Sequence, residues 1–403
     1  MINIPGRETP FQYLKNRDGK EFDKIIVANW YKARTYVLEK LKDIIIGPSS
    51  GKTLKVIVEI DRQHKDMMLS VVRHLALAAH FANYEEHNEF GEISHKNCTT
   101  IVIVSKDNDI EEELKKEHCL NNLLKYCQYT VNGEYGNTAN NLIPIDLDIV
   151  ITTHLPKDMD EDVVSMTYED VENVLGTKDD NEIFSIDTRK AALCYDVYNL
   201  GKEINNLPYE DIHNISRYNQ ALNVFQYNRL RNEIKPIINE EWKDSQKDVT
   251  NGLSNIFCAD RFSSIAAGIK DTCLSTGEDE TTLWEDKSMK LAISEHARWI
   301  VEKLIFGFRP VSDNERNRYE ELWGNQRKRY LMLLKEDPDI LLEKFHEDYS
   351  SEIFYDDKGI EHIAPAHINL CSFRELRRVD PDNRKYDSFL MLAIPIILDK
   401  IKE

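Results

Sequence analysis

Three short runs of apolar, β-branched residues in the first part of the chain constrain its fold more than any other feature. The runs are Leu54–Ile60, Thr99–Ser105 and Leu147–Thr152. Because each run is apolar at consecutive positions instead of every second one, we expect strands that are buried on both faces. The segment Met67–Asn83, between the first two runs, has apolar residues at helical spacing. Strands that alternate with helices predict right-handed crossovers and a parallel sheet.

The order of these segments divides the 403-residue chain into three predicted parts. The first part, residues 1–160, is expected to be an α/β domain of Rossmann-like plan. Residues 161–285 are expected to be a helical connecting region, although Val163–Asp180 at its start is acidic and is predicted to be irregular. The last part, residues 286–403, is expected to be mainly helical. A chain of this length is long enough for two or three domains.

The charge balance limits the partners that the chain can bind. Its formal net charge is −19 at pH 7. Such a charge repels phosphate backbones, so we expect no binding to bulk DNA or RNA. A small anionic ligand remains compatible with this charge, because a local group of Arg and Lys side chains or a helix N-terminus can bind one inside an acidic protein.

Targeting, cysteine and histidine patterns point to an ordinary intracellular protein. No stretch approaches the roughly 18 apolar residues that a membrane span requires, and residues 1–7 lack the apolar core of a signal peptide. The seven cysteines are scattered without a CxxC pair, as expected for buried thiols in a reducing compartment. The histidines show neither HExxH nor zinc-ligand spacing. We therefore expect a cytoplasmic protein with no membrane span and no metal site.

Two segments near the first strand have some features of phosphate-binding motifs. Gly47–Thr53 has three residues where a P-loop requires four between its first glycine and its Gly-Lys pair, and a strand follows it instead of a helix. The turn after the first strand lacks the GxGxxG pattern that lets a backbone approach a pyrophosphate closely. Asp61 in that turn could still bind a ribose hydroxyl, and Arg62 and His64 could contact a phosphate. A solvated, charged turn is the alternative interpretation.

The segment Ser294–Leu304 is predicted to be a helix with two different faces. One face carries Glu295, Trp299 and Glu302 at spacings of four and three, with Lys303 beside them. Carboxylate, indole and ammonium groups are costly to bury together unless each has a partner, which makes this face a candidate recognition surface. The alternative is a packed indole with solvated charges. The opposite face is a core stripe formed by Ile293, Ala297, Ile300 and Leu304.

Two segments of the C-terminal part resemble, in the same order, the two halves of the ryanodine-receptor (RyR) domain. Glu295–Trp299, Glu302–Leu304 and Gly307-Phe308 are similar to the first half, which reads roughly as a hydrophobic residue, His-Glu-x-Trp, then Lys and then Gly-Trp. His367–Leu376 and Arg384–Asp387 are similar to the second half, which ends on a Lys-x-Tyr-Asp pattern. The resemblance implies that residues 286–403 form an RyR-like domain of mainly helical structure.

The resemblance has departures and also an extension. Phe308 stands where the family has Trp, and an insert, residues 311–366, separates the two halves. Upstream, Leu253–Arg261 is similar to the segment before the RyR unit in bacterial proteins that join a TrkA-like Rossmann domain to an RyR domain. With that segment the likeness extends loosely over residues 54–395. Many of those relatives carry a membrane pore in front of the Rossmann part, and since no such span is visible in this sequence we expect no channel role to carry over.

The resemblance implies a sensor or effector that binds a nucleotide-derived ligand, including cyclic nucleotides, in bacterial antiviral defence. That is an analogy at the level of the fold. The residue types agree with it, because aromatic rings can stack on a base and basic side chains can pair with phosphate oxygens. No cofactor is otherwise indicated. The predicted ligand-binding residues are Glu295, Arg298, Trp299, Lys303, Phe308, Arg309, His367 and Tyr386.

Three other functions stay open. The Rossmann-like part could act as an enzyme on a nucleotide, although neither a GxSxG elbow nor the spacing of a catalytic triad is visible, so catalysis is not what we expect. The acidic surface and the insert 311–366 could form a protein-interaction scaffold. The chain could also be a regulatory subunit of a separately encoded channel. A homo-oligomer and a complex with a protein partner are both compatible with the sequence.

Overall fold

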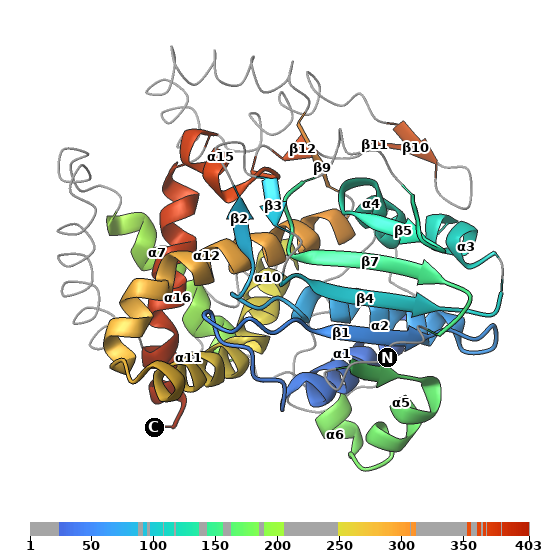
Figure 1. Cartoon of the computed structure of the whole chain (residues 1–403), viewed down its shortest axis with the longest axis horizontal. Helices are drawn as coiled ribbons and strands as arrows, with labels where there is room; N and C mark the ends of the chain where they lie inside the picture. Colours follow the sequence, from blue (N-terminus) through green and yellow to red (C-terminus); the bar gives the residue numbers. More distant parts are fainter. Residues whose placement is uncertain are drawn as a thin grey trace.

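A six-stranded, mostly parallel sheet lies at the centre of the N-terminal half (Figure 1). Its strand order is β6-β5-β7-β4-β1-β8, and only the edge strand β6 runs antiparallel to its neighbour. The three predicted strands are confirmed as β1, β4 and β7, and their parallel pairing is confirmed as well. The strands are β1 (Lys55–Glu59), β4 (Thr99–Val104), β5 (Tyr129–Val131), β6 (Glu134–Tyr135), β7 (Leu147–Thr152) and β8 (Val163–Met166).

The computed structural model describes most of the chain. The described residues are 24–87, 92–94, 97–107, 109–116, 118–136, 143–155, 163–184, 189–204, 249–306, 308–311, 353–355, 361–363, 366–367, 369–379 and 381–402. Most of the predicted insert 311–366 therefore lies outside the described residues. The described part of the insert includes two short antiparallel strands, β10 (Ile353–Tyr355) and β11 (Glu361–Ile363).

The prediction that Val163–Asp180 is irregular was wrong for most of the segment, which forms a strand and a helix, and only residues 176–179 are a turn. Within Val163–Asp180, β8 pairs in parallel with β1, from Lys55 opposite Val163 to Val58 opposite Met166. Helix α5 (Tyr168–Leu175) follows, and the Thr167 side chain caps it by accepting a hydrogen bond from the Asp170 N–H at 3.2 Å. Acidic residues in the first turn of a helix stabilise it through their interaction with the helix dipole, and Glu169 and Asp170 occupy the first turn of α5. The acidity of this segment was therefore a sign of a helix. The sheet therefore extends beyond residue 160.

Helices cover the sheet and form the rest of the described structure (Figure 1). Near the sheet lie α1 (Lys24–Leu41), α2 (Lys65–Ala78), α3 (Ile110–Lys116) and α4 (His118–Tyr126). The remaining helices are α6 (Asp180–Ile183), α7 (Arg189–Ile204), α10 (Val249–Asp260), α11 (Phe262–Thr276), α12 (Glu280–Ile305), α15 (Phe373–Val379) and α16 (Pro381–Lys402). No helix within the described part of the chain has the length and apolar character needed to cross a bilayer.

Helix α12 joins the two halves of the molecule. Asp279 caps its N-terminus by accepting a hydrogen bond from the Thr282 N–H at 3.2 Å. The helix packs against α2 and α4 beside the sheet, and against α11 and α16 on its other sides. Its predicted core stripe is buried at Ala297, Ile300 and Leu304. One continuous apolar cluster runs through the sheet, α1, α2, α12 and α16. The predicted parts 1–160 and 286–403 thus share a core.

Candidate functional site

Three aromatic rings and one ammonium group converge at the C-terminal end of α12. Trp299 lies on the helix, Phe308 follows it, and His367 belongs to the short strand β12 (Ala366–His367). The His367 ring lies edge-on to both others, with centroids 4.9 Å from Trp299 and 6.0 Å from Phe308. The Lys303 Nζ lies 5.5 Å from the Trp299 ring centroid and 5.7 Å from that of Phe308. We call these four residues the aromatic cluster; its three rings are half-buried.

Backbone geometry at the end of α12 brings these side chains together. Trp299 and Lys303 are four residues apart and share a face of the helix. The Phe308 N–H donates to the Lys303 carbonyl at 2.9 Å, the six-residue closure that ends many helices. From α4, Asn122 donates to the Leu304 and Phe308 carbonyls, each at 2.7 Å. This segment is therefore fixed to a helix of the sheet layer.

A short parallel strand pair places His367 beside this helix end. Strand β9 (Arg309–Pro310) pairs with β12, with Ala366 opposite Arg309 and His367 opposite Pro310. The Asn369 N–H donates to His367 Nδ1 at 3.2 Å, so the proton of a neutral His367 ring lies on Nε2. Burial, followed by the nearby charges of Lys303 and His296, lowers the pKa of His367 to about 3. His367 is therefore an uncharged ring at neutral pH.

The second imidazole next to Trp299 has the opposite character. His296 stacks on Trp299 with ring centroids 5.8 Å apart and an interplanar angle of 15°. Its Nε2 lies 3.0 Å from the Cys371 carbonyl oxygen, and its Nδ1 lies 3.5 Å from an oxygen of Asp387. Burial alone would lower the pKa of His296, but the bonds to Asp387 and Cys371 raise it to about 10. His296 thus carries a positive charge behind the indole.

A row of buried ion pairs begins at the aromatic cluster and runs along α12. Lys303 Nζ lies 3.2 Å from Glu302 Oε1, and the other oxygen of Glu302 accepts from Arg298 Nη1 at 2.7 Å. Arg298 Nε also donates to Glu295 Oε1 at 2.8 Å. Glu295 Oε2 accepts from Arg261 Nη1 at 2.8 Å. Burial alone would raise the pKa of Glu295, but Arg298 and Arg261 hold it below its ordinary value.

The row continues from Arg261 to the sheet. Arg261 Nη2 donates to the His80 carbonyl at 2.6 Å and to Ser294 Oγ at 2.9 Å. The His80 ring bonds through Nδ1 to Asp146 and through Nε2 to the Ala76 carbonyl at 2.7 Å. Both ring nitrogens of His80 therefore face oxygen atoms, one from the carboxylate that precedes β7 and one from the backbone of α2. We call this row the ionic chain; it consists of Lys303, Glu302, Arg298, Glu295, Arg261, His80 and Asp146.

The predicted ligand-binding residues fall into three groups. Trp299, Lys303, Phe308 and His367 come together in the aromatic cluster. Glu295 and Arg298 are 3% and 1% exposed, and both are used in the ionic chain, so their contact with a ligand stays a prediction that the geometry does not favour. The third group is formed by the two others: Arg309 is buried on β9 with Nη1 bonded to the Pro310 carbonyl, and Tyr386 lies half-buried on α16.

Several contributing residues were missed by the sequence analysis. His80 and Asp146 were not singled out, although each is a charged or polar residue next to apolar ones, a pattern that points to a buried partner. Asn122 interrupts the buried leucines of α4 in the same way. The pattern indicates that a partner exists, but it does not identify the partner.

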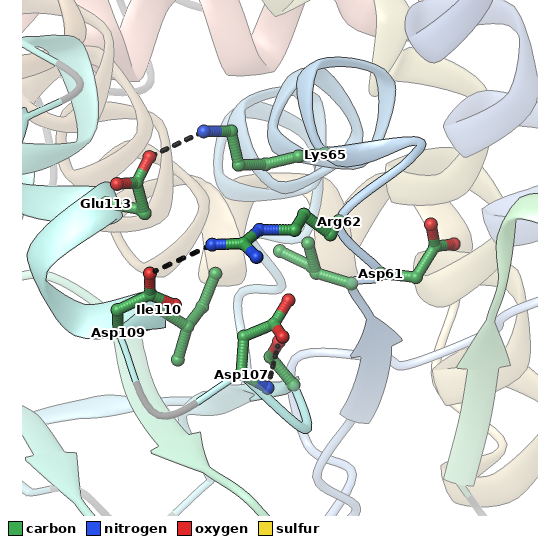
Figure 2. Close-up of a pocket in the computed structure, with 9 residues that line it drawn as sticks. Asp61, Arg62, Lys65, Asp107, Asp109, Ile110 and Glu113 are labelled. Atoms are coloured by element: carbon green, nitrogen blue, oxygen red, sulfur yellow. Dashed lines mark hydrogen bonds and ion pairs between the residues drawn. The ribbon is translucent and has the colours of Figure 1, made fainter.

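A separate cavity of about 100 Å³ lies at the carboxyl edge of β1 and β4 (Figure 2). It contains two of the residues predicted for the Rossmann-type site, Asp61 and Arg62. Figure 2 shows Arg62 reaching towards Asp109, with 3.7 Å between their charged atoms, while Lys65 bonds to Glu113 at 2.5 Å. Four carboxylates and two cationic groups line the cavity: Asp61, Asp107, Asp109 and Glu113 against Arg62 and Lys65.

The third residue predicted for that site is engaged elsewhere. His64 stacks on Tyr168, with ring centroids 3.6 Å apart and an interplanar angle of 8°, and lies 2.9 Å from an Asp61 oxygen. Asp61 also accepts from the backbone N–H groups of Gln63 and His64, at 2.8 and 3.0 Å. Its carboxylate thus occupies the start of α2, where a bound phosphate would lie in a dinucleotide site. Nucleotide binding here stays a prediction that this arrangement disfavours.

In comparisons with known proteins, no protein-family model, curated protein or solved structure matches this chain.

Within the described residues, no group of three or more His, Cys, Asp or Glu side chains could hold a metal ion. The functional argument therefore depends on the aromatic cluster and on the charges that surround it.

Proposed function

We propose that the aromatic cluster binds a nucleotide-derived small ligand, and that the protein is a sensor or effector for that ligand. The observation that carries the proposal is the convergence of Trp299, Phe308 and His367 around the Lys303 ammonium. The three rings are half-buried, and Lys303 is buried beside them. Rings at such positions offer faces and edges to a base, and stacking a base on an aromatic ring contributes about 1–3 kcal/mol. A setting in bacterial defence rests on the RyR resemblance alone.

The charges around the aromatic cluster favour an anionic group on the ligand. Lys303, Arg309 and His296 are cationic, whereas Glu302 and Asp387 are the carboxylates nearest to them in the contacts given above. His367 stays neutral and so does not repel a cationic or neutral base edge. A chain with a net charge of −19 that keeps such a local positive excess is suited to a small phosphate-bearing molecule rather than to a nucleic acid.

The cavity at the sheet edge supports a nucleotide site less well. Typical ligand pockets measure roughly 300–1,000 Å³, and this one measures about 100 Å³. Its lining is net negative, and both of its cationic side chains already have carboxylate partners. An enzyme that uses the Rossmann-like part on a nucleotide is therefore the weaker proposal.

Calorimetry with the full-length protein tests the proposal. We expect at least one member of a panel of adenine and guanine mononucleotides, dinucleotides and cyclic nucleotides to bind. Trp299→Ala should then weaken binding by about 1–3 kcal/mol, or roughly 5- to 150-fold in Kd, because the stacking face is lost. Trp30→Ala is the matched control, since Trp30 is an indole that packs on Tyr31 and His74, neither of which belongs to the aromatic cluster.

Two results would contradict the proposal. One is the absence of binding for every nucleotide of the panel. The other is binding that Trp299→Ala and Lys303→Met leave unchanged, because the ligand would then occupy another site.

A further inference from the structure

The ionic chain connects the aromatic cluster physically to the sheet. At one end, the Lys303 ammonium lies over the rings of Trp299 and Phe308. At the other end, Asp146 directly precedes β7. Each side chain of the row is at most 7% exposed. The interaction between these charges is therefore little screened by water or salt.

In the ionic chain, neighbouring ion pairs share carboxylates, so a change of charge at one end alters the ion pairs further along. Glu302 is shared between Lys303 and Arg298, and Glu295 is shared between Arg298 and Arg261. When a shared carboxylate loses one cation, the remaining cation is attracted more strongly to it and less to its other partner. A charge removed at one end therefore redistributes the bonds of the next pair.

The last link is mechanical as well as electrostatic. Arg261 holds the carbonyl of His80, which follows α2, and the hydroxyl of Ser294 on α12. His80 in turn is bonded to Asp146 at the start of β7 and to the Ala76 carbonyl of α2. A change in the position of Arg261 thus acts directly on the contact between α12, α2 and the sheet.

We propose that the ionic chain couples occupancy of the aromatic cluster to the packing of α12 on the sheet. An anionic group that draws Lys303 away from Glu302 shifts Arg298 towards Glu302 and weakens its bond to Glu295. Arg261 then follows Glu295 and loosens its hold on the end of α2. The identity of the ligand rests on the proposed function, but the coupling is a property of the protein without ligand. It is a conformational link of the kind that lets a binding site control a distant surface.

Hydrogen exchange on the full-length protein tests the coupling from the cluster end. Lys303→Met removes the ammonium group from Glu302, as an anionic ligand would. We expect several-fold faster amide exchange at residues 76–83, which include the backbone that Arg261 holds. Lys287→Met is the matched control, because Lys287 lies on the same helix and contributes no bond to the ionic chain. Unchanged exchange at residues 76–83 in a folded Lys303→Met protein would overturn the proposal.

A second variant tests the same coupling from the sheet end. With 5-fluorotryptophan incorporated, and the Trp299 signal assigned through Trp299→Phe, Asp146→Asn should shift the fluorine resonance of Trp299. Asp260→Asn is the control, since Asp260 precedes Arg261 in sequence but pairs with Arg34 on α1. A Trp299 resonance that moves with neither variant, or equally with both, would also refute the coupling. Because no ligand is present in either test, their result is independent of the nucleotide titration.

Discussion

At the scale of single residues, the two imidazoles beside Trp299 show how neighbours set charge. His296 and His367 are both close to the indole, but Asp387 and Cys371 raise the pKa of His296, whereas burial and the Lys303 ammonium lower that of His367. The pKa values are about 10 and about 3. At neutral pH the result is one cationic and one neutral imidazole in contact with the same indole.

The raised pKa of His296 predicts a pH dependence of stability. In the unfolded chain the imidazole loses its proton near its ordinary pKa of 6.5, whereas in the folded protein it keeps the proton until about pH 10. Between these values the folded state binds more protons, so the free energy of unfolding should fall as the pH rises. The stabilisation is complete below pH 6.5 and is lost as the pH passes about 10.

Urea unfolding from pH 6 to 10, on the wild type and on His296→Gln, measures this effect. The other titrating groups are common to both proteins, so the difference between the two curves isolates His296. The wild type should lose its advantage over the variant as the pH rises. Parallel curves would mean that His296 is not held as a cation.

Residues of the site differ in how far the sequence could predict them. Trp299 and Lys303 share a helix face by spacing alone, and the glycine before Phe308 suits the end of that helix. The burial of Glu295 and Arg298 was not predictable in the same way. It depends on which face of α12 is covered by α2 and α4, and on Arg261 from another helix, none of which is encoded near residue 295.

At the scale of elements, two glycines allow a close backbone crossing between the loop before β1 and α11. A Cβ on Gly268 would lie 2.7 Å from the Ile46 carbonyl oxygen, and one on Gly47 would lie 2.6 Å from the Gly268 carbonyl oxygen. These atoms belong to the backbone and cannot rotate away. The loop that resembles a phosphate-binding motif in composition is thus fixed by packing against a helix.

Gly268→Ala should therefore destabilise the protein, although alanine is the better helix former by about 1 kcal/mol. Overpacking of a tight contact costs about 1–3 kcal/mol. We expect this cost to exceed the gain in helix propensity, because the atoms that the new Cβ meets belong to the backbone. Gly51→Ala is the control, because a Cβ there meets no atom within 4 Å. Thermal unfolding compares the two variants with the wild type. A Gly268→Ala protein that is more stable than the wild type would show that the crossing can widen freely.

Element prediction succeeded where the pattern was long and failed where it was short. The apolar runs of β1, β4 and β7 are five or six residues long and were identified from sequence. Strand β8 has four residues, of which Met166 alone is fully buried, so its sequence carries little of the pattern of a core strand. Its place in the sheet is set by pairing with β1, a contact between residues that are far apart in the chain.

At the scale of the whole molecule, the continuous core means that the parts predicted from sequence depend on each other. Val56 and Ile101 of the sheet and Ile300 and Ile397 of the C-terminal helices belong to one buried cluster. Helix α12 also begins at Glu280, before the predicted boundary at residue 286. Periodicity along the chain locates elements, but it contains no information on which elements share a core.

This shared core predicts that the described parts unfold together. In urea, the loss of helix seen by circular dichroism and the change in tryptophan fluorescence should coincide, because a shared apolar core couples the sheet to α12 and α16. A fragment that ends at residue 278 should not unfold cooperatively, because it exposes the faces of α2 and α4 that α12 covers and leaves Arg261 without Glu295. Two separate transitions in the full-length protein, or a fragment with a sharp transition of its own, would show that the N-terminal part is an independent domain.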